Sequence, residues 1–144
     1  MPEVHILNGP NLDLLGVREP HIYGTTTLAD IRRLCEAVAK GPLRFEQTND
    51  EGEMIDMIHI ARDVADGIII NPAGWSFRSV AILDALATFE GPVIELHLSN
   101  IHARDISHRH SIMSQGVTAV IAGLGANGYP TALSAMYDLI GLQS

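Results

Sequence analysis

Short runs of apolar residues alternate along the chain with segments in which apolar residues recur every three or four positions. The short runs are typical of buried β-strands, and the recurring residues are typical of helices that bury one face. Strict alternation of strand and helix predicts an α/β fold, with a five-stranded parallel sheet and helices on both faces. Strands are expected over residues 4–7, 43–47, 67–71, 92–97 and 117–122.

The helices are predicted from the apolar residues between these strands. Thr27 suits the N-cap of the first helix, and Gly41-Pro42 is expected to end it. The last helix is expected over residues 129–142. The stripes of the first three helices consist of Leu28, Ile31, Leu34 and Val38, then Met54, Ile55, Ile58 and Ala61, then Val80, Ile82, Leu83 and Leu86.

Polar and small residues follow every predicted strand. In a parallel sheet these segments share one edge, and ligands bind there near the point where strand order reverses. We therefore expect a ligand site at this edge. The five segments read NGPNLD, TNDEGE, NPAGWS, LSNIHARD and GLGANG.

Composition narrows the class of protein. The length of 144 residues suits one domain over residues 1–144. Only 18% of residues are charged while 47% are apolar, which indicates a well-buried sheet and further surface buried between subunits. A net charge of -8 argues against a nucleic-acid partner. The single cysteine, Cys35, excludes a disulfide framework, which favours a reducing compartment such as the cytoplasm. No apolar run approaches about 18 residues, so no membrane partner is expected.

Two familiar motifs fit poorly. GLGANG matches the glycine pattern of dinucleotide-binding folds, but the chain ends before the acidic residue that such a fold needs, so a tight turn with close helix packing is the better interpretation. Ser76, Asp84 and His97 occur in the order of an α/β-hydrolase triad, but Arg78 occupies a position where the nucleophile elbow needs glycine. A hydrolase is therefore a weak alternative.

Four histidines lie close together in the sequence, at positions 97, 102, 108 and 110. No thiolate joins them and their spacing matches no familiar ligand frame, so no metal site is expected. His102 and His110 suit surface positions. His97 ends a predicted strand at the ligand edge, and Glu95, on the same face of that strand, could orient its ring.

A long loop before the first helix carries the segment REPHIYG over residues 18–24, which is too rich in Gly and Pro to predict a helix. Arg18 could favour the phenolate form of Tyr23, because a neighbouring cation lowers the pKa of a tyrosine. Together with His97, this pair could supply a base and an acid at one site.

Five stretches that together span most of the chain carry a family resemblance. They read ILNGPNLDLLGVREPHIYG, QTNDEGEMIDMI, GIIINPAGWSFRSVAILDAL, PVIELHLSNIHAR and GLGANGY. In this combination the chain resembles the type II 3-dehydroquinate dehydratases. The resemblance implies a flavodoxin-like fold, no cofactor, and a homododecamer built from four trimers.

The resemblance also implies a mechanism, the trans elimination of water from 3-dehydroquinate to 3-dehydroshikimate in the shikimate pathway. Tyr23, with Arg18 beside it, would remove the C2 proton as a phenolate. A water bound to Asn11 would stabilise the resulting enolate, and His97 would protonate the departing C1 hydroxyl.

The substrate contacts follow from the same resemblance. The backbone N–H groups of Leu98 and Ser99 would bind the substrate carboxylate, and Asn71 would bind ring hydroxyls. Asp84 would act across a contact within a trimer, and the long loop would close as a lid. His108 is expected at a further substrate contact, where the family has arginine.

Other positions depart from the family pattern. Phe77 replaces a histidine that contacts a ring hydroxyl, Leu83 replaces an arginine, and Asp13 replaces an asparagine. Three functions stay open: a dehydroquinase with a divergent pocket, a paralogue that dehydrates or binds a related cyclic hydroxy acid, and a non-enzymatic binding protein. Retention of the acid-base residues speaks against the last of these. Arg78 or Arg109 could supply the missing contacts.

Overall fold

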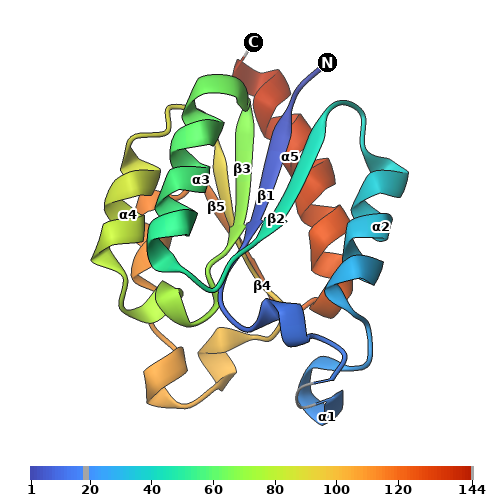
Figure 1. Cartoon of the computed structure of the whole chain (residues 1–144), viewed down its shortest axis with the longest axis vertical. Helices are drawn as coiled ribbons and strands as arrows, with labels where there is room; N and C mark the ends of the chain where they lie inside the picture. The colour runs from blue at the N-terminus through green and yellow to red at the C-terminus, as the bar shows by residue number, and fades with distance from the viewer. Residues whose placement is uncertain (18–19, 144) are drawn as a thin grey trace.

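The computed structural model describes residues 1–17 and 20–143 and has a five-stranded sheet at its centre (Figure 1). The strand order is β2-β1-β3-β4-β5, and every neighbouring pair is parallel. All five predicted strands are confirmed, with ends that differ by no more than two residues. Their bounds are Val4–Asn8 for β1, Leu43–Gln47 for β2, Gly67–Asn71 for β3, Val93–His97 for β4 and Ala119–Ala122 for β5.

Four longer helices cover the two faces of the sheet, as expected. The pair α2 and α5 packs on one face, and the pair α3 and α4 packs on the other (Figure 1). Among the described residues, no helix is long and apolar enough to cross a membrane. The helices run over Leu28–Val38 for α2, Glu51–Val64 for α3, Val80–Ala87 for α4 and Gly128–Gln143 for α5.

Alternate residues of the strands supply two separate hydrophobic cores. Val4 and Ile6 of β1 pack with α2 and α5, whereas Leu7 packs with α3 and α4. Because both faces are covered, all five residues of β3 are buried. The near-continuous apolar runs in the sequence therefore reflect a sheet that has no solvent-facing side at its centre.

The first long helix begins as predicted but buries a different stripe. Thr27 caps α2 in a reciprocal capping box with Asp30. Ile31 and Cys35, four positions apart, are fully buried, whereas Leu34 and Val38 are 39% and 45% exposed. The predicted stripe was therefore wrong at Leu34 and Val38. The helix turns Cys35 toward the sheet and leaves these two side chains partly in solvent.

Strict alternation fails between β4 and β5. This connection is described throughout, and it contains three short 3-10 helices and no α-helix: Ile101–Ala103, Ile106–His108 and Ile112–Gly116. The side chains of Asn100, Asp105 and Ser111 each accept a hydrogen bond from the backbone N–H two residues later. Such local bonds compete with helix formation, so the chain turns repeatedly instead of continuing as a helix.

The long connection after β1 also contains more helix than predicted. Leu12–Leu14 forms a 3-10 turn, and Pro20–Tyr23 forms a single helical turn, α1. The expectation that the segment over residues 18–24 would not be helical is thus wrong for residues 20–23. Proline is well suited to the first position of a helix, where its missing N–H is not needed. In Figure 1, α1 lies beyond the carboxyl ends of the strands.

Candidate active site

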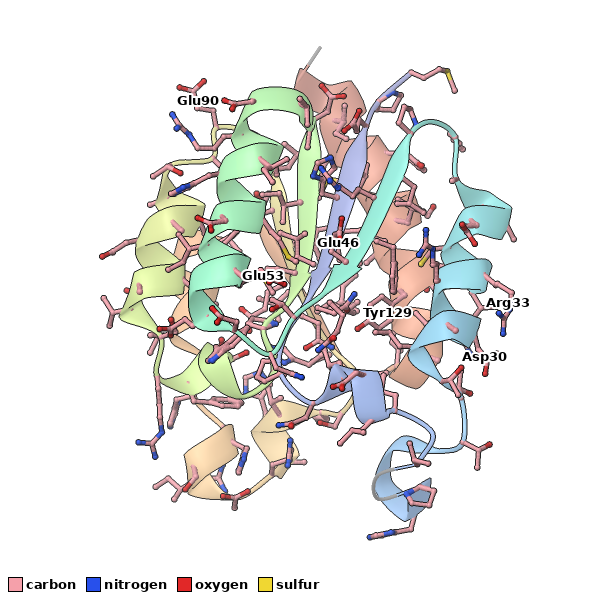
Figure 2. The ribbon with its side chains drawn as sticks, in the orientation of Figure 1. Asp30, Arg33, Glu46, Glu53, Glu90 and Tyr129 are labelled. Carbon is pink, nitrogen blue, oxygen red and sulfur yellow. The ribbon has the colours of Figure 1, made fainter. Side chains whose placement is uncertain are left out.

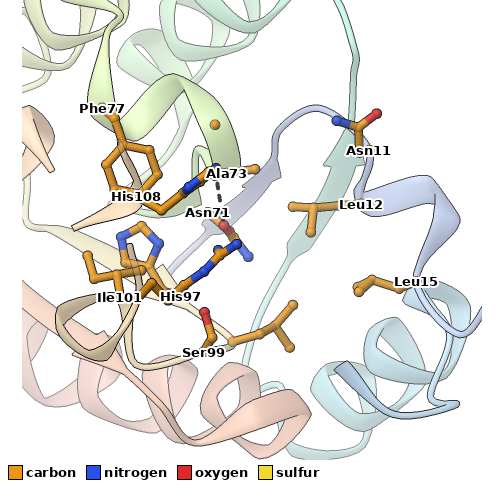
Figure 3. Close-up of a pocket in the computed structure, with 13 residues that line it drawn as sticks. Asn11, Leu12, Leu15, Asn71, Ala73, Phe77, His97, Ser99, Ile101 and His108 are labelled. Carbon is orange, nitrogen blue, oxygen red and sulfur yellow. Dashed lines mark hydrogen bonds between the residues drawn. The ribbon is translucent and has the colours of Figure 1, made fainter. Parts of the chain in front are cut away.

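A pocket lies at the carboxyl ends of β3 and β4, bordered by the turn that follows β1 (Figure 3). It is at the predicted edge of the sheet, next to the β1–β3 pair where the strand order reverses. The topology thus brings together side chains from distant parts of the sequence. Six predicted site residues line the pocket: Asn11, Asn71, His97, Leu98, Ser99 and His108.

His97 ends β4 and is held by a buried carboxylate. Its Nε2 atom pairs with Oε2 of Glu95, as the strand spacing predicted, and Ser114 Oγ donates to the other carboxylate oxygen at 2.7 Å. Burial raises the pKa of Glu95, but the hydrogen bonds from His97, Ser111 and Ser114 outweigh this and bring it below its usual value. Glu95 therefore carries a negative charge, so the imidazole donates from Nε2, and its Nδ1 is left for other contacts.

The turn GLGANG supports the backbone that follows His97. Gly123 and Gly125 have positive φ values of 92° and 62°. Their N–H groups donate to the carbonyls of His97 and Leu98, at 3.3 and 2.9 Å. A Cβ on Gly128 would lie 3.0 Å from the side chain of Leu96. The interpretation as a tight turn with close helix packing is confirmed.

Asn11 adopts an uncommon backbone conformation at the edge of the pocket. Its φ of 69° lies in the left-handed region, which asparagine tolerates better than most residues. The side chain of Asn49 accepts a hydrogen bond from the Asn11 N–H at 2.9 Å, which holds the turn in place. Asn11, in the turn that follows β1, is thereby held at the edge of the pocket that it lines.

Aromatic rings form one wall of the pocket. The ring of Phe77 is stacked on that of His97, with centroids 6.5 Å apart and planes at 26°, and it meets His108 edge-on at 5.5 Å. Nδ1 of His108 donates to Oδ1 of Asp105 at 2.8 Å, and this hydrogen bond lowers the pKa of Asp105. His108 is thus oriented from outside the pocket by a charged carboxylate.

Arg104 also lines the pocket and was not singled out from the sequence. The segment LSNIHARD at the ligand edge contains this one permanent cation, which could have identified it as a candidate for binding an anion. Arg109 does not take this place, because its guanidinium donates twice to the carbonyl of Arg104, at 3.1 and 2.9 Å. Arg78 is exposed and is not among the lining residues.

Several predicted residues lie elsewhere. Asp84 is exposed on α4 and does not line the pocket. Ser76 Oγ is buried without a hydrogen-bond partner, and His97 pairs with Glu95, so the hydrolase triad is not formed. Arg18 and the side chain of Tyr23 lie outside the described residues, and their roles stay predictions.

The histidine-rich segment does not gather around a common point. His102 and His110 are exposed, as expected of surface residues. Within the part of the chain that the structure describes, no three His, Cys, Asp or Glu side chains are close enough together to hold a metal ion.

Sequence comparisons find relatives over nearly the whole chain. The family model for dehydroquinase class II matches residues 2–137. The 3-dehydroquinate dehydratase of Cereibacter sphaeroides strain KD131 is 53% identical, covering 94% of this chain and 95% of the relative. The 3-dehydroquinate dehydratase of Streptomyces coelicolor is 50% identical, covering 98% of this chain and 92% of the relative.

Solved structures agree with these relatives. The type II dehydroquinase from Propionibacterium acnes has a TM-score of 0.90 and 45% identity, covering 96% of this chain and 97% of that one. A 3-dehydroquinate dehydratase-like protein from Bifidobacterium longum has a TM-score of 0.70 and 28% identity, covering 98% of this chain and 99% of that one. The chain therefore belongs to the dehydroquinase class II family of hydro-lyases and has its α/β, flavodoxin-like fold.

Proposed function

We propose that this protein is a 3-dehydroquinate dehydratase that forms 3-dehydroshikimate by trans elimination of water. The observation that carries the proposal is the pairing of His97 with the buried carboxylate of Glu95 in a pocket that also contains Asn11 and Asn71. Relatives that are about half identical in sequence bear the name of this activity.

In this proposal Tyr23 is the base and His97 is the acid. The phenolate of Tyr23, stabilised by Arg18, removes the C2 proton and leaves an enolate. A water held by Asn11 donates to the enolate oxygen. Glu95 keeps its charge and orients the ring of His97, which in its protonated form gives a proton to the departing C1 hydroxyl so that it leaves as water.

The remaining lining residues bind the substrate. Its carboxylate is placed at the backbone N–H groups of Leu98 and Ser99, and Asn71 takes a ring hydroxyl. Arg104 and His108 also line the pocket, and their donors favour an anionic substrate. No cofactor takes part in this scheme, since acid, base and enolate stabiliser are all side chains or water.

The activity is tested by following the absorbance of the conjugated enone product when purified protein is mixed with 3-dehydroquinate. We expect turnover by the wild type and a loss of at least about 10²-fold for His97→Ala, the scale of positioned acid catalysis. His102→Ala removes an exposed histidine from the same connection and should leave turnover unchanged. A folded wild type that forms no enone would overturn the proposal.

A related cyclic hydroxy acid is the second candidate substrate, and it is favoured by the phenyl ring of Phe77 at the pocket wall. A phenyl ring has no N–H or O–H to donate and no lone pair to accept a hydrogen bond. A substrate hydroxyl left unpaired against it loses about 1–3 kcal/mol of binding free energy. We expect the combined changes Phe77→His and His108→Arg to raise kcat/KM for 3-dehydroquinate, mainly through KM. If the two changes lower kcat/KM for 3-dehydroquinate and the wild type is already efficient, the related cyclic hydroxy acid is excluded as the substrate.

We also propose the assembly that the family resemblance implied, a homododecamer of four trimers in which Asp84 reaches a neighbouring site. Support comes from the outer face of α4, where Asp84 is exposed and Val80, four residues earlier, is 59% exposed.

A cytoplasmic location and a single domain over residues 1–144 stay predictions from composition and length.

A further inference from the structure

A continuous line of hydrogen bonds runs through the buried region behind the pocket. It joins the end of β1, the end of β3 and the start of α5, and it includes Tyr129, which Figure 2 labels. Asn8 Nδ2 donates to the carbonyl of Glu46 at 2.9 Å, and the Tyr129 hydroxyl donates to Asn8 Oδ1 at 2.7 Å. Asn71 Nδ2 donates to the Tyr129 oxygen at 2.9 Å, and the N–H of Ala73 donates to Asn71 Oδ1 at 3.2 Å.

Backbone groups at both ends give this line a single direction. The carbonyl of Glu46 can only accept and the N–H of Ala73 can only donate, so turning over either asparagine amide would break its hydrogen bond to the backbone and set two like groups against each other. Asn8, Asn71 and Tyr129 are at most 3% exposed, which leaves little room for water to replace a lost partner.

Tyr129 is the link between the two amides. Burial raises the pKa of its hydroxyl, so it stays protonated and always has one proton to donate. That proton goes to Asn8, and the lone pairs are left for Asn71. The hydroxyl therefore selects the nitrogen end of the Asn71 amide and rejects its oxygen end.

This selection decides what Asn71 offers to the pocket that it lines (Figure 3). An amide has two N–H donors and one oxygen with two lone pairs. Tyr129 takes one N–H and Ala73 takes one lone pair. One donor and one acceptor of the Asn71 amide remain, and a hydroxyl group can use both, since it also has a donor and an acceptor.

We infer that Tyr129 is a positioning residue that orients the Asn71 amide, so that Asn71 can bind one substrate hydroxyl as donor and acceptor together. The orientation itself follows from the hydrogen bonds. The identity of the hydroxyl as one of 3-dehydroquinate rests on the proposed function.

The kinetic test is Tyr129→Phe, which removes only the hydroxyl. We expect KM for 3-dehydroquinate to rise about 5- to 10-fold, the scale of one lost hydrogen bond, with kcat changed by less than about twofold because the contact is made equally in substrate and transition state. Tyr137→Phe is the matched control. Tyr137 lies on the same helix, and its hydroxyl accepts a hydrogen bond from the N–H of Lys40 at 2.8 Å. Removing this hydroxyl should leave KM unchanged.

A double-mutant cycle separates positioning from general stability. In an Asn71→Ala background, Tyr129→Phe has no amide to orient, so it should raise KM no further. Equal KM effects of Tyr129→Phe with and without Asn71 would overturn the inference, as would a folded Tyr129→Phe protein with wild-type KM.

Hydrogen exchange tests the orientation of the Asn71 amide by Tyr129 without an activity assay. In a ¹⁵N-labelled wild type, the Asn71 side-chain proton that is donated to Tyr129 should exchange far more slowly than the side-chain amide protons of the exposed Asn127. We expect exchange at Asn71 to be at least about tenfold faster in Tyr129→Phe and unaltered in Tyr137→Phe. Fast exchange at Asn71 in the wild type would overturn the inference even if Tyr129→Phe does not fold. A wild type without dehydratase activity would instead contradict only the proposed function.

Discussion

At the scale of single residues, the proposed chemistry of the pocket depends on Glu95, a carboxylate that has no exposed surface. Glu95 remains charged because its oxygens accept hydrogen bonds from His97 and Ser114. A buried charge that is hydrogen-bonded in this way holds its partners in a fixed geometry. The imidazole of His97, the acid of the proposed mechanism, is therefore positioned by a charged partner at the end of β4.

Glu95→Gln tests this electrostatic role. Glutamine keeps the size of the side chain and an oxygen that can accept from His97, but it carries no charge. We expect kcat to fall by about 10- to 100-fold with little change in KM, because the loss is confined to the proton transfer. Glu46→Gln, which neutralises a carboxylate paired with Arg44 away from the pocket, should behave as wild type. Equal kcat in both variants would contradict the role.

Glu95 also links stability to pH. Its folded-state pKa lies below the usual value of 4.5, so its charge stabilises the fold above about pH 4.5, and this contribution is lost as the pH falls through the folded-state value. We expect the urea-unfolding free energy of the wild type to decrease on acidification below pH 4.5 more steeply than that of Glu95→Gln. Parallel slopes would contradict the lowered pKa.

At the scale of elements, the sequence predicts the strands, which depend on the burial of many residues. It does not predict segments whose conformation is set by a single local hydrogen bond. The strands follow from apolar runs such as GIIIN, which the sheet buries completely. The connection after β4 does not follow, because the caps at Asn100, Asp105 and Ser111 replace a helix with turns.

The same distinction holds for the pocket. Polar residues at strand ends, such as His97 and Asn71, could be predicted because a parallel sheet brings those ends to one edge. Tyr129 could not, because a buried tyrosine on a helix has the same pattern as any core aromatic. The positioning role that we infer for Tyr129 depends on a contact with Asn8, 121 positions away in the sequence.

Gly123→Ala tests the turn that supports the strand-end histidine. Alanine at a φ of 92° is strained, and its Cβ would meet Asn100 at 3.3 Å. We expect a loss of about 1–2 kcal/mol in the free energy of unfolding, measured by urea denaturation. Gly125→Ala is the matched control: its φ of 62° is in the ordinary left-handed region and nothing lies within 4 Å of the added Cβ, so the loss should be smaller. The reverse order would contradict the steric argument.

At the scale of the whole molecule, several large apolar side chains are exposed on the single chain. Val80 is 59% exposed on α4, and Val17, Ile106 and Leu124 are 76%, 77% and 52% exposed in the connections near the ligand edge. Contact between copies would remove this surface from water. We therefore expect light scattering to give a mass of about 190 kDa, twelve times the chain mass of 15.6 kDa.

Subunit mixing tests whether such contacts complete the site. Asp84 is exposed and lies outside its own pocket, so if it acts in catalysis it does so in a neighbouring copy. Asp84→Ala and His97→Ala should each lower turnover when pure. After the two are dissociated together and reassembled, some pockets combine an intact His97 with an intact Asp84 from the adjacent chain, and activity should return. Asp63→Ala, an exposed change on α3, should not lower turnover. Mixed assemblies that stay inactive would place the action of Asp84 within its own chain or outside catalysis, and a monomer in light scattering would exclude the shared site altogether.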